Sequence, residues 1–369
     1  MSTTPVTDQR IENARKTVLE DGRTLGCDEL LALIDAPLEE LLALSGEVTR
    51  RFAPLDFNEC AIMNTRNGGC TESCRWCAQS RRWNTGSEAM GPMATPEAAL
   101  KAARATEAFS VPRFSLVCSG RKLGRREVRE AAGILEALKR GTGVETCASM
   151  GLLSYEDFVA LKKAGLIRYH CNLETGPRFF PEVCGSHTFE DKVETLRAAR
   201  RAGLDLCSGG LFGMGETMTD RIEMVLVLRE LGVASIPLNF LIPIPGTPLE
   251  NRPVMTAEEM LRTVALFRLA VPAAQLRFAG GRLHFTDEDV LRAMKAGVNA
   301  AIVGDLLTTR GSRVGGEREL ARKAGYRTVE TKMTGASEMP VRRTVHVVPV
   351  GAASGTDDSP AGETRRITR

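Results

Sequence analysis

Short apolar runs alternate with amphipathic segments from about residue 58 onward, and this alternation occurs eight times. Short apolar runs bounded by turn residues are typical of buried strands, while apolar residues at i, i+3 and i+4 predict helices that bury one face. The predicted strands cover residues 60–64, 113–118, 145–149, 167–173, 204–211, 235–242, 275–279 and 300–303.

A predicted helix follows each of these strands. Several helices open with Ser or Thr and carry an acidic residue three positions later, as in Ser154–Asp157 and Thr188–Asp191, which is the pattern of a capping box. Several close with a glycine, such as Gly165 or Gly203. The helices cover residues 96–109, 125–141, 154–165, 188–203, 217–231, 256–270, 286–297 and 317–325.

Strand–helix alternation of this kind predicts a parallel sheet in the α/β class. Eight units of about 30 residues favour closure into a (β/α)8 barrel of the TIM type. An open, doubly wound sheet is the rival fold, but no G-x-G-x-x-G follows the first predicted strand. We therefore expect the barrel.

The barrel is expected to occupy residues 55–327, between two segments of different character. Residues 1–54 hold three predicted helices, at 8–22, 27–35 and 37–53. Residues 328–369 mix Gly, Ser, Pro and charged residues without periodicity, so we expect a flexible tail and assign it no function.

Charge and composition exclude several classes of function. The chain of 369 residues carries 49 Lys and Arg against 46 Asp and Glu, a net charge of +3, which gives no reason to expect nucleic acid or an anionic membrane as a partner. No apolar run approaches the length of a membrane span. The first residues contain no apolar stretch typical of a secretion signal, so a cytoplasmic location is expected.

The cysteines depart from this ordinary composition. Nine of the ten fall between Cys60 and Cys207, and a chain of this length without a secretion signal is not a disulfide scaffold. Clustered thiols in a reducing compartment are more often metal ligands or catalytic groups. Cys27, in the amphipathic segment near the N-terminus, is instead expected to be a small buried residue.

Three cysteines with the spacing C-x3-C-x2-C follow the first predicted strand: Cys70, Cys74 and Cys77. Three thiolates can hold three irons of a cubane cluster, whereas an electron-transfer cluster normally has four cysteine ligands. The remaining iron is then open to a small molecule, by the logic of an open catalytic metal site. Chemistry in such barrels is found at the carboxyl ends of strands, where this loop lies. Zinc with one ligand missing is the alternative.

The motif, with Trp76 just before its last cysteine, resembles the signature of radical S-adenosylmethionine (radical SAM) enzymes. The resemblance implies that Cys70, Cys74 and Cys77 bind a [4Fe–4S] cluster whose open iron holds S-adenosylmethionine. One electron then cleaves this cofactor to methionine and a 5′-deoxyadenosyl radical. Trp76 would lie beside the adenine; a packing aromatic is the plainer interpretation.

Further stretches narrow the resemblance to the biotin synthase family. They are CTESCRWCAQS (70–80), RFSLVCSG (113–120), ETCASMG (145–151), YHCNLET (169–175), CSGGLFGMGET (207–217), PLNFLIPIPGTPL (237–249) and RFAGGR (277–282). The resemblance implies a sulfurtransferase that forms biotin by radical sulfur insertion into dethiobiotin. It also implies an electron donor such as flavodoxin or ferredoxin, and a homodimer. The rivals are a related radical mutase or hydrogenase-cluster maturase, and a metal-stabilised binding protein without turnover.

The same resemblance implies a second, auxiliary iron–sulfur cluster deeper in the barrel as the sulfur donor. In the better-known form its ligands are one cysteine on each of strands two, three and five and an arginine on strand seven. Cys147, Cys207 and Arg277 match, but the strand-two position is Ser115. Cys60 or Cys184 is expected to replace the missing ligand, and the cluster is [2Fe–2S] or larger. For Arg277, carboxylate binding at the barrel mouth is the alternative.

Other positions match family residues that bind cofactor or substrate. For S-adenosylmethionine, the resemblance implies contacts to the ribose, the methionine carboxylate and the methionine amine. The matching residues are Asn172 and Glu174, then Lys192, then Cys118 and Ser119 at the end of strand two. The alternatives are a strand-end cap for Asn172 and a solvated helix residue for Lys192.

The expected substrate-binding residues are His170, Asn172, Asn239 and Arg277. His170 stands where the better-known members have Asn. Asn239 lies in an apolar run, and an unpaired buried amide costs about 1–3 kcal/mol, so a ureido ring is expected to satisfy it. Cys118 and Cys171 are also read as packing or site-lining residues. Glu216, in a GxGE turn, is expected to serve the turn and not an anion.

Overall fold

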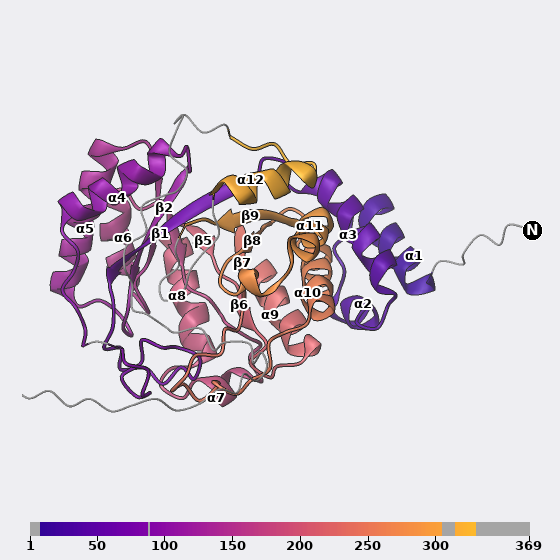
Figure 1. Cartoon of the computed structure of the whole chain (residues 1–369), viewed down its shortest axis with the longest axis horizontal. Coiled ribbons are helices and arrows are strands. Elements are labelled where there is room, and N and C mark those ends of the chain that lie inside the picture. The colour runs from indigo at the N-terminus through magenta and orange to yellow at the C-terminus, as the bar shows by residue number, and fades with distance from the viewer. Residues whose placement is uncertain (1–7, 88, 305–313, 330–369) are drawn as a thin grey trace, which may run out of the picture.

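The computed structural model describes residues 8–87, 89–304 and 314–329, and it folds as a parallel barrel enclosed by helices (Figure 1). Every strand pairing is parallel, as βα units require. The strands are β1 (Asn58–Arg66), β2 (Arg113–Cys118), β3 (Glu145–Ser149), β4 (Arg168–His170), β5 (Asp205–Cys207), β6 (Gly210–Phe212), β7 (Ser235–Phe240), β8 (Gln275–Phe278) and β9 (Val298–Ile302).

The ring runs in the order β5-β4-β3-β2-β1-β9-β8-β7-β6 and closes where Cys207 of β5 pairs with Ser235 of β7. β5 and β6 are two halves of one predicted strand, 204–211, that is interrupted at Gly209. A Cβ on Gly209 would lie 1.9 Å from the carbonyl oxygen of Pro237, so only glycine fits this close approach. The predicted eight-stranded barrel is confirmed, with its fifth strand broken.

The helices of the barrel lie outside the ring of strands, and several begin at the predicted caps, including Ser154 and Thr188. They are α4 (Pro96–Ala108), α5 (Arg125–Gly141), α6 (Tyr155–Ala164), α8 (Phe189–Arg201), α9 (Met218–Glu230), α10 (Ala257–Ala270), α11 (Asp287–Ala296) and α12 (Val314–Lys323). Sequence analysis missed two short elements in loops, α7 (Phe180–Val183) and the 3-10 turn η2 (Arg282–His284).

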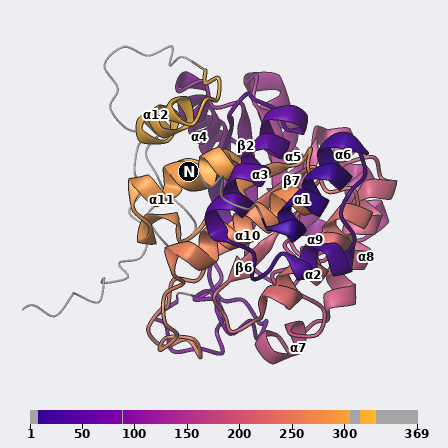
Figure 2. The ribbon, with the colours of Figure 1, turned by 90° about the vertical axis from the view of Figure 1, so that its right-hand side faces the viewer.

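The N-terminal segment packs on the outside of the barrel near α9, α10 and α11, as Figure 2 shows. It consists of α1 (Gln9–Arg15), a π-helical turn η1 (Lys16–Glu20), α2 (Cys27–Ala32) and α3 (Leu38–Phe52). The Thr49 hydroxyl donates to the carbonyl of Ala296 at 3.2 Å and so ties α3 to the end of α11. The predicted tail, 328–369, lies outside the described residues beyond 329.

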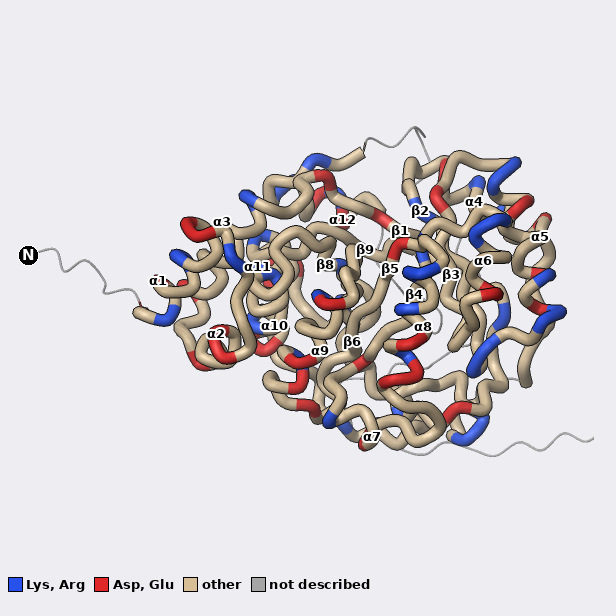
Figure 3. Tube along the Cα trace, turned by 180° about the vertical axis from the view of Figure 1, so that it is seen from behind, with Lys and Arg blue, Asp and Glu red and all other residues tan. Residues whose placement is uncertain are grey.

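Cys27 lies on the surface of the N-terminal segment, and charged residues are spread over the outer helices. Cys27 is exposed, so the expectation that it is buried was wrong: it is the first residue of α2, and Leu30 fills the buried position of that helix. Positive and negative segments are interspersed along the outer helices (Figure 3), as the near-neutral charge suggests. In the described part of the chain, no helix is long and apolar enough to cross a membrane.

The turn after β6 has the structural role expected for Glu216. Its buried carboxylate accepts hydrogen bonds from the backbone N–H groups of Gly213, Met214 and Gly215, at 2.9 to 3.1 Å. Arg221 donates to the same carboxylate from α9 at 2.8 Å. A carboxylate already occupies this nest of N–H groups, so an anionic ligand has no place in it.

Candidate active site in the barrel

The cysteine loop leaves the carboxyl end of β1 and is fixed by its own backbone. The Cys77 N–H donates to the carbonyl of Cys74 at 3.1 Å, and the Cys70 N–H donates to the carbonyl of Gln79 at 2.9 Å. Gly69 has φ +54°, and a Cβ there would lie 2.4 Å from the Met90 nitrogen. Glycine is therefore required for the loop to turn so tightly before its first cysteine.

The three thiols of this loop fit a cluster better than a single metal ion. Thiolates around one zinc lie within about 4 Å of one another, since each is about 2.3 Å from the metal. Among the described residues, Cys70, Cys74 and Cys77 do not form a group with sulfurs that close; the group whose ligand atoms lie within 4.8 Å of one another is Cys74, Cys184 and His187. All ten cysteines lie in the described residues, and all are free. The donor set thus suits a cubane, which spreads its cysteine ligands more widely.

A cavity of about 370 Å³ runs from this loop into the barrel. Trp76 and Cys77 of the loop line it together with Asn172 and Glu174, which follow β4. Strand residues line its deeper part, which we call the floor: Cys60, Arg113, Cys147, Arg168, Cys207 and Arg277. One continuous cavity therefore connects the two predicted cluster sites.

The floor thiols interact with one another. The hydrogen bond between Cys60 and Cys147 raises the pKa of Cys60 well above its usual value and lowers that of Cys147 to about 6, and nearby arginines support the lowering. Burial raises the pKa of Cys207. Ser115 pairs in register with Cys147, where the family's strand-two cysteine would stand. The structure thus places Cys60 beside Cys147, as a replacement ligand requires.

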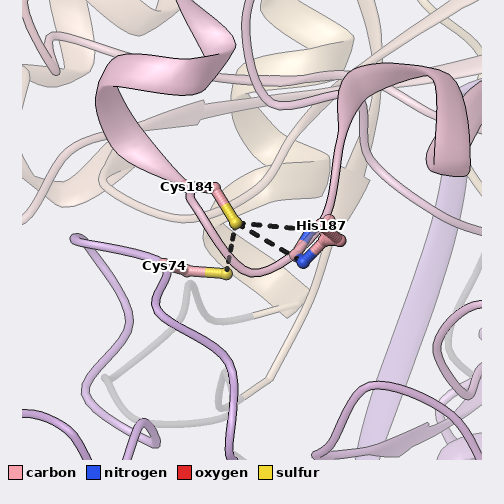
Figure 4. Close-up of side chains that lie close together, drawn as sticks. All are labelled: Cys74, Cys184 and His187. Carbon is pink, nitrogen blue, oxygen red and sulfur yellow. Dashed lines mark hydrogen bonds between the residues drawn. The ribbon is translucent and has the colours of Figure 1, made fainter.

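Cys184 lies apart from the floor thiols. Its sulfur is 3.8 Å from that of Cys74 and 3.4 Å from Nδ1 of His187, in the loop that follows α7 (Figure 4). It does not line the cavity that holds Cys60 and Cys147. Between the two replacement ligands proposed from sequence, the geometry favours Cys60.

Arg277 is buried and tied to the barrel wall. Its Nη1 donates to the carbonyls of Asn58 at 3.1 Å and Ala301 at 2.8 Å, and its Nε donates to the hydroxyl of Ser235 at 3.3 Å. Burial lowers the pKa of its guanidinium. The side chain lies beside the start of β1, so the alternative of an arginine at the barrel mouth was wrong. Its role as a ligand stays a prediction.

Two further arginines of the floor were missed from sequence. Arg113 and Arg168 are the first residues of β2 and β4 and line the cavity. Each is paired outward, with Glu145 and Asp205 respectively, yet Nε of both and Nη1 of Arg113 are buried without a hydrogen-bond partner. Unpaired buried donors indicate a site for an acceptor or anion. The signal in the sequence that could have identified these arginines is a charged residue at the first position of a strand that is otherwise buried.

The predicted ribose ligands lie together past the end of β4. The strand ends at His170, earlier than predicted, and Glu174 adopts φ +72°, an uncommon conformation for a residue other than glycine. The Asn172 amide nitrogen lies 3.3 Å from a carboxylate oxygen of Glu174, and its oxygen accepts from the Gly209 N–H at 3.0 Å. Backbone strain of this kind is common at ligand sites.

Lys192 faces inward from α8 and is only 8% exposed. Its ammonium donates to the Asn172 carbonyl at 2.8 Å and lies 3.9 Å from the Glu174 carboxylate. Burial lowers its pKa, but the negative charges of Cys171, Glu174, Cys74 and Cys184 together leave the pKa raised. The alternative of a solvated helix lysine was therefore wrong, and Lys192 joins Asn172 and Glu174 in one polar group.

The last residue of β2 and the residue after it lie outside the cavity. Neither Cys118 nor Ser119 lines it. The backbone N–H and carbonyl of Ser119 are both engaged with Arg66, at 2.8 and 2.6 Å, and the Cys118 thiol contacts the Met93 sulfur at 3.8 Å. Burial raises the pKa of Cys118 to about 12. Packing is the role these contacts support, and cofactor binding by the pair stays a prediction.

The predicted substrate residues His170 and Asn239 both line the cavity. His170 Nδ1 is 3.4 Å from the Cys207 sulfur, and burial lowers its pKa to about 4, so the ring is neutral near pH 7. The Asn239 amide donates to the Gly210 carbonyl and accepts from the Gly280 N–H, each at 3.0 Å. Backbone groups therefore satisfy the oxygen and one N–H of this amide, and substrate binding by Asn239 stays a prediction.

Comparison with known sequences shows which families this chain resembles. Residues 65–228 match the radical SAM superfamily, and residues 237–327 match the Biotin and Thiamin Synthesis associated domain. The chain is 45% identical to the biotin synthase of Porphyromonas gingivalis over 86% of this chain and 95% of that protein. It is 46% identical to biotin synthase 2 of Corynebacterium diphtheriae, over 83% of this chain and 92% of the relative.

Solved structures share the fold at low sequence identity. The [FeFe]-hydrogenase maturase HydG from Carboxydothermus hydrogenoformans superposes with a TM-score of 0.73 at 16% identity, covering 87% of this chain and 79% of that one. Methylornithine synthase (PylB) gives 0.71 at 15% identity, covering 88% and 98%. At such identity these likenesses establish the barrel and nothing about substrate.

Proposed function

The chain belongs to the biotin synthase family of radical SAM enzymes, and from this premise we propose how its residues insert sulfur into dethiobiotin. The observation that carries the proposal is the single cavity that joins the cysteine loop to the thiols of Cys60, Cys147 and Cys207. When bound, the first cluster with S-adenosylmethionine supplies hydrogen-atom abstraction at unactivated carbons, and the second cluster supplies the sulfur. The protein's own groups bind, orient and exclude water.

The cysteine loop and the polar group of Asn172, Glu174 and Lys192 form the region that we call the mouth. There, Cys70, Cys74 and Cys77 hold the first cluster. Trp76 lines the cavity where an adenine can stack on it. The polar group after β4 suits the rest of the cofactor: Glu174 accepts from ribose hydroxyls, and the Lys192 ammonium pairs with the methionine carboxylate. Its raised pKa keeps that ammonium charged.

At the floor, Cys60, Cys147 and Cys207 hold the second cluster, with Arg277 beside them. Arg113 and Arg168 direct unpartnered N–H groups into a buried region and balance the negative charge of thiolates and sulfides. Arg277 is the ligand match of the family, and its existing hydrogen bonds position it against β1 and β9.

Between the two sites the cavity wall mixes apolar side chains with a few polar groups, as ligand cavities commonly do. Ile62, Val117 and Leu211 provide apolar surface for the aliphatic part of dethiobiotin. The free hydrogen-bonding capacity of Asn239 and the neutral ring of His170 provide polar contacts. Dethiobiotin would lie within reach of both clusters while the walls exclude water.

We also propose a flavodoxin or ferredoxin as the electron donor, a homodimer as the assembly and the cytoplasm as the location. The family resemblance supports the first two. The ten free thiols support a reducing compartment.

The test is turnover by anaerobically purified protein with dethiobiotin, S-adenosylmethionine and dithionite, with flavodoxin in a parallel reaction. We expect biotin and 5′-deoxyadenosine by mass spectrometry, and iron and acid-labile sulfide sufficient for two clusters. Cys70→Ala should abolish both products, while Cys27→Ala, which changes an exposed thiol on α2 outside the barrel, should retain both. Iron for two clusters with no biotin formed from dethiobiotin would refute the proposal.

A further inference from the structure

The loop after α7 is bound along the cysteine loop by a series of hydrogen bonds. The Arg75 N–H donates to the Val183 carbonyl at 3.0 Å, and the Gly185 N–H donates to the Ser73 hydroxyl at 3.1 Å. The Ser73 N–H donates to the Ser186 hydroxyl at 2.9 Å. Segments about 110 residues apart in sequence thus form one unit, and residues 183–187 support the cysteines.

This contact places the Cys184 sulfur 3.8 Å from the sulfur of Cys74, while Cys184 itself is only 3% exposed (Figure 4). That separation is within reach of a hydrogen bond between sulfurs. When Cys74 binds iron it does so as a thiolate, which carries no proton. A hydrogen bond between the two sulfurs then has the Cys184 thiol as its donor.

The neighbours of Cys184 hold it in this place. Nδ1 of His187 lies 3.4 Å from its sulfur and 2.6 Å from a carboxylate oxygen of Glu72, and Ser186 donates to the same oxygen at 2.8 Å. Glu72 is itself only 7% exposed and precedes Cys74 by two residues. A carboxylate that fixes a histidine beside a metal ligand is a common second layer around metal sites.

We propose that Cys184 is a positioning residue that donates a hydrogen bond to the Cys74 sulfur and thereby raises the reduction potential of the first cluster. Hydrogen bonds to cluster sulfurs favour the more negative, reduced state. The inference rests on the proposed assignment of Cys70, Cys74 and Cys77 to that cluster. Through easier reduction, Cys184 increases the fraction of protein that can cleave S-adenosylmethionine at a given donor potential.

The experiment compares four anaerobically loaded full-length proteins: wild type, Cys184→Ala, Cys184→Ser and Cys27→Ala, whose exposed thiol lies on α2 away from the cysteine loop. The readout is the midpoint potential of the first cluster, from redox titration followed by electron paramagnetic resonance, alongside iron and sulfide content. We expect Cys184→Ala to retain its iron and titrate at a more negative potential. Cys184→Ser keeps a hydroxyl donor and should shift less, and Cys27→Ala should match wild type.

Each result decides the inference. An unchanged potential in Cys184→Ala, or an equal shift in Cys27→Ala, would overturn it. Loss of first-cluster iron in both Cys184 variants would also overturn it, because Cys184 would then be a ligand or a structural group. A wild-type protein without the cluster signal would instead refute the proposed function. The two failures are thus distinguishable.

Discussion

The mouth and the floor of the cavity both gather cysteines, but the chain brings them together in different ways. At the mouth, Cys70, Cys74 and Cys77 lie within eight residues of one loop. At the floor, Cys60, Cys147 and Cys207 come from three strands that span almost 150 residues. A local spacing determines the first group, whereas strand register and barrel closure determine the second.

The two regions also differ in charge. The mouth combines the ammonium of Lys192 with the carboxylate of Glu174, 3.9 Å apart, which suits a ligand carrying both an amine and a carboxylate. The floor gathers three arginines, and the carboxylates paired with Arg113 and Arg168 belong to residues that do not line the cavity. A positive floor suits a group rich in thiolate and sulfide.

The largest effect should come from removing a floor thiol. In Cys147→Ala we expect biotin formation to fall by more than about 100-fold, because even second-layer changes at metal sites cost about 10- to 100-fold. Formation of 5′-deoxyadenosine should persist, since the mouth is intact. Mass spectrometry of both products is the measurement, and Cys27→Ala is the control. Parallel loss of both products would show that the two regions do not act separately.

Removing Arg277 should weaken the floor as a structure. Arg277→Met leaves the carbonyls of Asn58 and Ala301 without this donor, and leaving a buried acceptor unsatisfied costs about 1–3 kcal/mol. We expect the free energy of unfolding in urea to fall by that order. A stability equal to wild type, together with lost iron, would mean that the arginine acts as a ligand and not as a support.

A change at the mouth should affect cofactor binding and leave the floor intact. In Lys192→Met we expect KM for S-adenosylmethionine to rise about tenfold or more, since hydrogen bonds to charged groups contribute about 1.5–3 kcal/mol. The iron content of the second cluster should not change. An unchanged KM with a lower kcat would remove Lys192 from the cofactor site and leave it as a support for Asn172.

The smallest effect concerns the cap of α8, the helix that carries Lys192. The Thr188 N–H bonds to the Asp191 carboxylate and lowers its pKa. This hydrogen bond contributes fully to stability above about 3.9, the pKa of Asp in the unfolded chain. Its contribution is lost as pH falls through the lower pKa that Asp191 has in the folded protein.

In Asp191→Asn we therefore expect a loss of less than about 1 kcal/mol at pH 7, because the exposed carboxylate is screened by solvent. The free energy of unfolding of the variant should also depend less on pH below about 4. Urea unfolding at several pH values measures both effects. A larger loss that persists at low pH would mean that the cap is not what Asp191 contributes.

Sequence periodicity predicted the strands and helices well because each barrel unit has a strong local pattern. β2 and β3 have their predicted bounds. The predictions failed where tertiary contact overrides local pattern. The fifth strand breaks because Gly209 approaches Pro237, and β4 ends at His170, before Glu174 adopts a left-handed conformation. Neither contact leaves a trace in periodicity.

The sequence alone determined the barrel, the cysteine loop and the family, since these depend on residue type and on spacing within short segments. The tertiary structure decided which distant groups meet. It placed Cys60 beside Cys147, Cys184 beside Cys74, and Arg113 and Arg168 with Arg277 at the floor. The physical reason is that side chains from different strands become neighbours through register and ring closure, which no single stretch of the chain encodes.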